Sequence, residues 1–175
     1  MGLRGTFQVG RIAVHPDDPD VVYVGALGRL WGPNEERGVF KTTDGGRTWS
    51  HPIDTPTGQH AGPGVLADGR LIYVGLGPVE NRAGICAWES TDKGDTWEKV
   101  GEIPCSKETP EEMELGENHL VEISPGHLLV LFRTGTGDWD NQFLHQSHSH
   151  DAGRTWSEAE RLPVWGYPPH LTGLS

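Results

Sequence analysis

Several loops of this chain concentrate the side chains that recognise sugars. Three long, irregular segments, 28–38, 77–83 and 134–141, hold Trp31, Glu35, Glu36, Arg37, Glu80, Arg82, Asp138, Trp139 and Asp140. Carboxylates accept hydrogen bonds from hydroxyl groups, and tryptophan rings offer an apolar face to the carbon face of a sugar. The loops therefore predict a sugar-binding surface, with ordinary solvated loop residues as the alternative at any one position.

A glutamate inside an apolar strand is the second chemical signal. Residues 120–128 read LVEISPGHL, which places Glu122 between Val121 and Ile123. A carboxylate in such a place is costly to bury without a partner. A glutamate there needs a reason, and the next apolar segment ends at a cation, Arg133. A structural ion pair between them, or exposure of Glu122 in a central channel, stays open as the alternative.

His145, His148 and His150 form a group that could suggest a metal site. On a strand, His148 and His150 face one way and His145 the other, so the three rings do not converge. The chain also lacks a nucleophile elbow, a P-loop and a dinucleotide fingerprint. We therefore expect no metal and no cofactor.

The elements that would hold these residues are short strands. Apolar alternation recurs between clusters of Gly, Pro, Asp and Asn, as in RIAVH, VVYVGAL, GVFKTT, GVLADGRLIYVGL, GICAWEST, HLVEIS, HLLVLFRT and QFLHQSHS. Alternation bounded by turn residues is typical of half-buried antiparallel strands. Helical periodicity is nearly absent. The sequence therefore predicts an all-β fold.

Three octapeptides follow one template, Ser/Thr-x-Asp-x-Gly-x-Thr-Trp, at residues 42–49, 90–97 and 149–156. Their aspartates lie 92 − 44 = 48 and 151 − 92 = 59 residues apart, the spacing of a four-stranded repeat unit with variable loops. Aspartate accepts bonds from loop amides, and glycine takes the positive-φ position. We expect structural hairpins built by Asp44, Gly46, Thr48, Trp49, Asp92, Gly94, Thr96, Trp97, Asp151, Gly153, Thr155 and Trp156.

These octapeptides resemble the Asp boxes, or BNR repeats, of the sialidase (neuraminidase) superfamily of β-propellers. The resemblance covers nearly the whole chain and implies one partial propeller domain over 1–175. Its four-stranded blades would span about 8–56, 62–104 and 118–163, with the first strand of a fourth at 166–175. The first unit also resembles sortilin-like BNR glycosyl-hydrolase propellers. Because sialidase-like rings typically have six blades, either a longer polypeptide or a homodimer would complete the ring.

The resemblance implies a glycoside hydrolase that removes terminal, acidic sugars from glycans. LVEISPGHL is similar to the family pattern V-V-E-L-x-x-G-x-L, which implies that Glu122 polarises a tyrosine nucleophile. Arg133 would then orient the substrate and Asp138 would act at the mouth, with the carbohydrate bound by Trp31, Glu80, Arg82, Trp139 and Asp140.

The chain departs from the family pattern where arginines are expected. Pro63-Gly64-Val65 replaces an Arg-Ile-Pro motif, Phe143-Leu144-His145 replaces a second arginine site, and the late blades that carry the tyrosine are not in this sequence. The isolated chain is therefore expected to be catalytically incomplete. A non-catalytic propeller that binds glycans or proteins is the alternative.

Charge and hydropathy exclude two classes of protein. The chain has 14 Lys and Arg against 25 Asp and Glu, a net charge of −11, which opposes binding to nucleic acid. No apolar run approaches the ~20 residues of a membrane span, and the first residues lack the apolar region of a secretory signal. These features do not assign the protein to a cellular compartment. Cys86 and Cys105 could form one bridge, although two free thiols are the simpler expectation.

Overall fold

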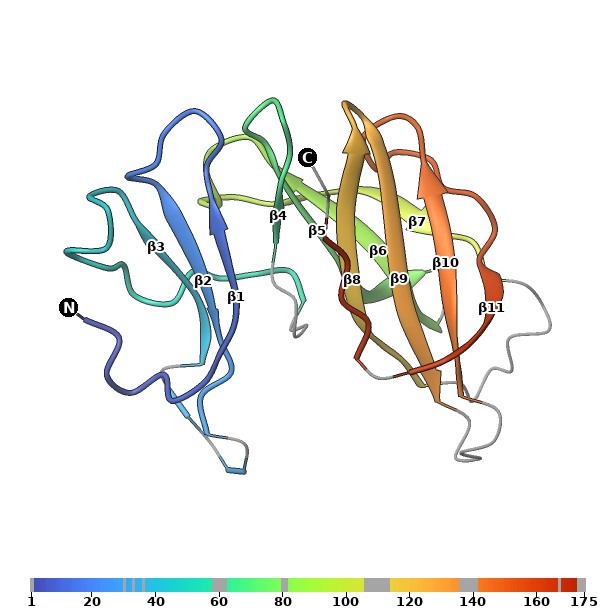
Figure 1. Cartoon of the computed structure of the whole chain (residues 1–175), viewed down its shortest axis with the longest axis horizontal. Helices are drawn as coiled ribbons and strands as arrows, with labels where there is room; N and C mark the ends of the chain where they lie inside the picture. Colours follow the sequence, from blue (N-terminus) through green and yellow to red (C-terminus); the bar gives the residue numbers. More distant parts are fainter. Residues whose placement is uncertain are drawn as a thin grey trace.

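A computed structural model gives the structure of the chain and describes residues 2–29, 31–32, 34–35, 37–57, 63–79, 82–105, 114–135, 142–166 and 168–172. Regular structure in these ranges consists of β-strands grouped into three antiparallel sheets (Figure 1). The all-β prediction is confirmed. Over the same ranges, no helix has the length and apolar character needed to cross a bilayer.

The sheets follow one another along the chain, and we call them blades 1, 2 and 3. Blade 1 contains β1 (Val9–Val14), β2 (Val22–Ala26) and β3 (Gly38–Thr42), in that order. Blade 2 contains β4 (Gly64–Val65), β5 (Leu71–Val79), β6 (Arg82–Ser90) and β7 (Glu98–Ile103). Blade 3 contains β8 (Glu114–Ser124), β9 (His127–Gly135), β10 (Phe143–Ser149) and β11 (Glu160–Trp165).

Blade 1 differs from the four-stranded unit that its sequence predicts. The segment after the first Asp box forms one isolated bridge, between Val39 and Ile53, in place of a fourth strand. The Ile53 amide donates to Val39 O at 2.7 Å, and beyond it the Ser50 amide donates to Lys41 O at 2.8 Å. The fourth strand of blade 1 is therefore reduced to a single bridged residue.

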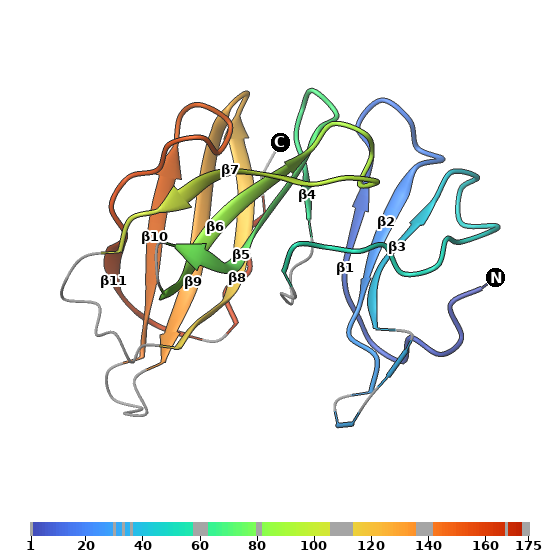
Figure 2. The same cartoon turned by 180° about the vertical axis from the view of Figure 1, so that it is seen from behind.

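The apolar core lies in the seams between blades. Ile72, Val130 and Phe132, each 0% exposed, belong to the cluster that joins blades 2 and 3. A smaller cluster around Tyr23 and Leu71 joins blades 1 and 2. Figure 2 shows the same sheets from behind, with the outer strand β7 crossing the view toward blade 3. Packing of blade on blade thus holds the sheets together.

The three Asp boxes adopt the same hydrogen-bonded hairpin. In the third box, Asp151 Oδ1 accepts from the Thr155 amide at 2.8 Å and Oδ2 accepts from the Thr155 hydroxyl at 2.6 Å. Ser149 Oγ accepts from the amide of Gly153, whose φ is 92°. The other two boxes repeat the Asp–Thr and Ser/Thr–Gly bonds. These side-chain acceptors satisfy backbone amides that have no partner strand once the chain turns.

The box tryptophans lie under their own hairpins. Trp156 is 8% exposed and donates from Nε1 to Gly153 O at 2.8 Å. Trp97 packs against Tyr73 with ring centroids 5.9 Å apart. Trp49 is half-buried, and a Cβ on Gly2 would lie 3.4 Å from its ring. Each indole thus anchors a turn.

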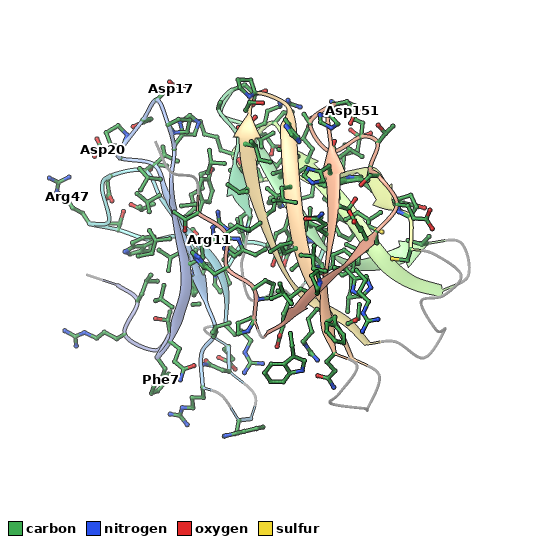
Figure 3. The ribbon with its side chains drawn as sticks, turned by 45° about the vertical axis from the view of Figure 1, so that its right-hand side comes forward. Phe7, Arg11, Asp17, Asp20, Arg47 and Asp151 are labelled. Carbon is green, nitrogen blue, oxygen red and sulfur yellow. The ribbon has the colours of Figure 1, made fainter. Side chains whose placement is uncertain are left out.

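The strands alternate direction, so the hairpins gather at two ends of the molecule. The boxes lie in the upper half of Figure 1, and Figure 3 shows Asp151 near the top and Arg47 lower, at the left side. The end of β9 and the start of β10 lie toward the lower edge, as does the end of β2. We call these edges the box end and the loop end. Cys86 and Cys105 are both free thiols.

Candidate functional site

An acid and an arginine pair at the loop end of blade 3. Arg133 Nε donates to Glu117 Oε2 at 2.9 Å, and each side chain is 15% exposed. Glu117 lies near the start of β8, and Arg133 lies near the end of β9, where it pairs with Gly116 in register. The sheet therefore holds a charged pair beside the β9–β10 loop.

A β-bulge positions Glu117. The register of β8 against β9 shifts between Gly116 and His119, and Glu117 has a φ of 52°. The left-handed region costs about 1–3 kcal/mol for a residue other than glycine and is found preferentially at functional sites. A bulge also re-aims a side chain out of the regular alternation. Glu117 therefore has both the strained backbone and the salt bridge.

Two buried amide oxygens lie within two residues of this pair along the strands. Asn118 follows Glu117, is 2% exposed, and donates from Nδ2 to Val74 O at 3.5 Å. Gln142 precedes β10, where Leu144 pairs with Arg133, and is 5% exposed. Within the described residues, Asn118 Oδ1 and Gln142 Oε1 accept no hydrogen bond. Buried acceptors without partners are costly, so both suit a donor such as water or a sugar hydroxyl.

His119 links the inner strands of blades 1 and 3. Its Nε2 lies 3.0 Å from Arg11 Nη1 of β1, and its Nδ1 lies 3.2 Å from the Leu171 amide. Burial, then the charges of Arg11 and His170, lower the pKa of His119 to about 4. A neutral imidazole has one lone pair to offer, so it can fully satisfy only one of the two donors.

Glu122 lies at the other end of β8. Its Oε2 accepts from the Ala67 amide at 2.6 Å, and its Oε1 accepts from the Gly126 amide at 2.9 Å. It lines a cavity of about 300 Å³ between the inner strands β1, β4 and β8. Glu122 therefore ties the β4–β5 and β8–β9 turns together and lines this cavity.

Glu122 and Arg133 are not brought together. Glu122 pairs with Leu128 in register, and Arg133 follows Leu128 by five residues. At ~3.3 Å per residue the two are separated by about 17 Å along the sheet. The acid that contacts Arg133 is Glu117. The catalytic role of Glu122 stays a prediction.

The remaining predicted site residues have different outcomes. Trp31 is 88% exposed in the β2–β3 loop at the loop end. Arg37 of the same loop donates to Leu27 O and Arg29 O at 2.8 Å, which makes it an anchor of the loop. Of Arg82 the structure describes the backbone alone, at the start of β6. The predicted residues outside the described ranges are Glu36, Glu80, Asp138, Trp139 and Asp140.

The histidines separate into two places. His148 Nδ1 lies 3.2 Å from His127 Nε2, and the rings of His127 and His150 are 4.1 Å apart. His145 instead stacks on Phe132. Across the described ranges, no three His, Cys, Asp or Glu side chains are arranged to hold a metal ion.

Sequence reasoning missed Glu117, Asn118 and Gln142. The strand predicted from HLVEIS begins after Gly116-Glu117-Asn118, whereas β8 starts at Glu114 and contains all three. Glycine inside a strand indicates a bulge or a close backbone approach. Gln142 carries no such signal, since its burial depends on the tertiary structure.

Comparisons with known proteins agree with this architecture. The sequence profile of the BNR repeat-like domain matches residues 12–170. A xyloglucanase of a Paenibacillus species is 29% identical over 154 residues, which cover 84% of this chain and 13% of that protein. The xyloglucanase Xgh74A of Acetivibrio thermocellus is 33% identical over 109 residues, covering 56% and 12%. The chain thus spans about one eighth of the length of these relatives.

Solved structures share the fold at low sequence identity. The α-L-arabinofuranosidase Arb93A of Fusarium graminearum superimposes with a TM-score of 0.54 at 18% identity, over 88% of this chain and 48% of that one. The Penicillium chrysogenum α-L-arabinanase superimposes with a TM-score of 0.55 at 17% identity, over 91% of this chain and 51% of that one. The Hadza microbial sialidase Hz136 superimposes with a TM-score of 0.56 at 19% identity, over 84% of this chain and 32% of that one. With a sialidase-like arrangement of sheets and the profile match over most of its length, the chain belongs to the BNR repeat-like family.

Proposed function

We propose that this chain supplies part of the sugar-binding centre of a glycoside hydrolase, with Glu117 and Arg133 at its core. The observation that carries the proposal is their half-buried salt bridge at the loop end, next to a strained bulge. The relatives named as xyloglucanases, arabinanase and sialidase support a carbohydrate substrate. Glycoside hydrolysis typically uses carboxylates to handle protons and to stabilise positive charge on the sugar ring.

Glu117 is the residue we assign to that chemistry. Its carboxylate would act as a base or would stabilise positive charge, and Arg133 would hold it in place. Asn118 Oδ1 and Gln142 Oε1 are buried beside the pair and would accept from bound water. A second acid, such as Asp138, would come from the β9–β10 loop.

The charge of the pair bears on the class of sugar. Arg133 contacts Glu117, so a substrate carboxylate would compete with that bond. The pair has no net charge, which favours a neutral sugar such as a pentose. The acidic sugar predicted from the sequence is the competing substrate, and it requires Arg133 to exchange partners.

Hydrolysis of fluorogenic arabinofuranoside, xyloside and sialoside tests the proposal. In the completed ring, whether a longer polypeptide or a homodimer forms it, we expect turnover of a neutral glycoside that Glu117→Gln lowers by about 100-fold or more, the usual effect of a general acid or base. Glu122→Gln is the matched control, because it changes the same chemical group at the box end and should leave turnover within a few-fold.

Three outcomes decide between the readings. If Glu117→Gln leaves the rate of hydrolysis unchanged and Glu122→Gln lowers it, Glu122 is the catalytic carboxylate. Preference for the sialoside would establish the acidic sugar. Binding of arabinobiose or sialyllactose by calorimetry without any turnover would favour the non-catalytic, glycan-binding alternative for this chain.

A further inference from the structure

The bulge that presents Glu117 needs support from outside its own strand. Glu117 has a φ of 52°, and the register of β8 against β9 shifts between Gly116 and His119. A left-handed residue other than glycine is unfavourable and persists only where the surrounding structure holds it. The salt bridge to Arg133 joins two side chains, so other contacts must hold the backbone of the bulge.

Both residues that follow Glu117 are anchored to other parts of the chain. Asn118 Nδ2 donates to Val74 O of blade 2 at 3.5 Å, which is long for such a bond. His119 is the residue at which pairing with β9 resumes, opposite Leu131, and it is 5% exposed. Because its ring is buried and its backbone is paired, His119 fixes the end of the bulge.

The imidazole of His119 is contacted from two sides. Arg11 Nη1 of β1 lies 3.0 Å from Nε2, and Figure 3 shows Arg11 between β1 and the strands of blade 3. The Leu171 amide lies 3.2 Å from Nδ1, and the ring centroids of His119 and His170 are 4.3 Å apart. His119 therefore joins the bulge to blade 1 and to residues 170–171.

Arg11 makes the stronger of the two contacts with the ring. Burial lowers the pKa of Arg11, and a guanidinium that is partly out of water needs an acceptor. Within the described part of the chain, Arg11 has no carboxylate partner, and its acceptor is His119 Nε2. A charged donor forms a stronger bond than a backbone amide does, so we assign the lone pair of the neutral ring to Nε2 and its proton to Nδ1.

We propose that Arg11 and His119 are positioning residues for Glu117. Arg11 donates to His119, and the imidazole held in this way keeps the bulge in the conformation that presents Glu117 to Arg133. A residue of blade 1 thereby sets the geometry of an acid in blade 3. Their role in catalysis rests on the proposed function, whereas the geometry of the bulge can be measured without any turnover.

The Nε–H signal of Arg133 reports where Glu117 lies. In the ¹⁵N-labelled chain this group donates to Glu117, so its exchange with water should be slow. We expect Arg11→Met and His119→Leu each to accelerate the exchange by about 5- to 100-fold, the factor that corresponds to the cost of a left-handed residue that is no longer held. The double variant should exchange no faster than His119→Leu, because both changes remove one contact.

Two further variants separate positioning from a general loss of stability. His119→Gln keeps an acceptor near the place of Nε2 and should retain most of the slow exchange, whereas His119→Leu keeps only the apolar volume. His145→Leu is the matched control, because His145 is another half-buried histidine of blade 3, stacked on Phe132. It should leave the Arg133 signal unchanged. Circular dichroism checks that each variant is folded.

The exchange rates decide the proposal. It is overturned if Arg133 Nε–H exchanges at the wild-type rate in His119→Leu, if His145→Leu accelerates the exchange as much, or if the effects of Arg11→Met and His119→Leu multiply in the double variant. In the completed ring, Arg11→Met and His119→Leu should lower kcat for the neutral glycoside and leave KM within a few-fold. A ring without turnover would refute the proposed function, and the exchange rates would still test the positioning role.

Discussion

Breaking the Glu117–Arg133 salt bridge from one side should destabilise the protein more than removing it altogether. Removing one partner of a fully buried pair costs about 3–5 kcal/mol, whereas an exposed pair contributes about 0–1 kcal/mol. At 15% exposure for both side chains, we expect about 2–3 kcal/mol for Arg133→Met or Glu117→Gln. For a chain of this size, that lowers the melting temperature by about 5–10 °C.

A double-mutant cycle measures this coupling. Urea unfolding followed by tryptophan fluorescence gives the free energy of unfolding of the wild type, both single variants and Arg133→Met/Glu117→Gln. The double variant leaves neither charge unpaired, so it should regain about 2 kcal/mol relative to the sum of the single effects. Strictly additive single effects would refute the view that the two residues act as one unit.

Three further effects follow from the structure. The pKa of His119 is about 4 in the folded protein, against an ordinary 6.5, so the unfolded chain binds the proton more tightly. The free energy of unfolding should therefore fall by about 3 kcal/mol as the pH is lowered from 6.5 to 4. His119→Gln should make the free energy of unfolding less dependent on pH in this range. Burial raises the pKa of Asp151, but hydrogen bonds from Thr155 outweigh it and bring the value to about 2. The protection factor of the Thr155 amide should therefore stay high at pH 4 and fall toward pH 2, and Asp151→Ala, which removes the acceptor oxygens, should abolish the protection at both. A Cβ on Gly101 would lie 2.9 Å from Arg154 O, so Gly101→Ala should cost about 1–3 kcal/mol in urea unfolding, while Gly116→Ala, with nothing within 4 Å, should cost less.

The sequence repeats were sufficient to predict the all-β architecture. Period-two alternation predicts the strands, and the three boxes mark the same turn in each blade. The boxes can be recognised in the sequence because the side-chain hydrogen bonds of each box join residues of one octapeptide. The same local rule failed after the first box, where the chain forms the Val39–Ile53 bridge in place of a fourth strand. Local chemistry is readable from a single sequence when both partners of a bond lie in one hairpin.

The candidate site was harder to predict because its partners are distant in sequence. Glu122 matched a family pattern, but its carboxylate is satisfied by amides of two turns, one of them 55 residues away. Glu117 reaches Arg133 only through a bulge that shifts the register of β8. A one-residue change in register reverses the face of a side chain, so the identity of the paired acid could not be read from spacing.

The identity of the residues that contact sugar can be observed directly. Titrating the ¹⁵N-labelled chain with arabinobiose or sialyllactose, while recording side-chain and backbone N–H signals, distinguishes the two ends of β8. The account predicts shifts at Arg133 Nε–H and the Gln142 side chain, with the Gly126 amide bound to Glu122 unchanged. Shifts at Gly126 and Ala67 with Arg133 unaffected would contradict it.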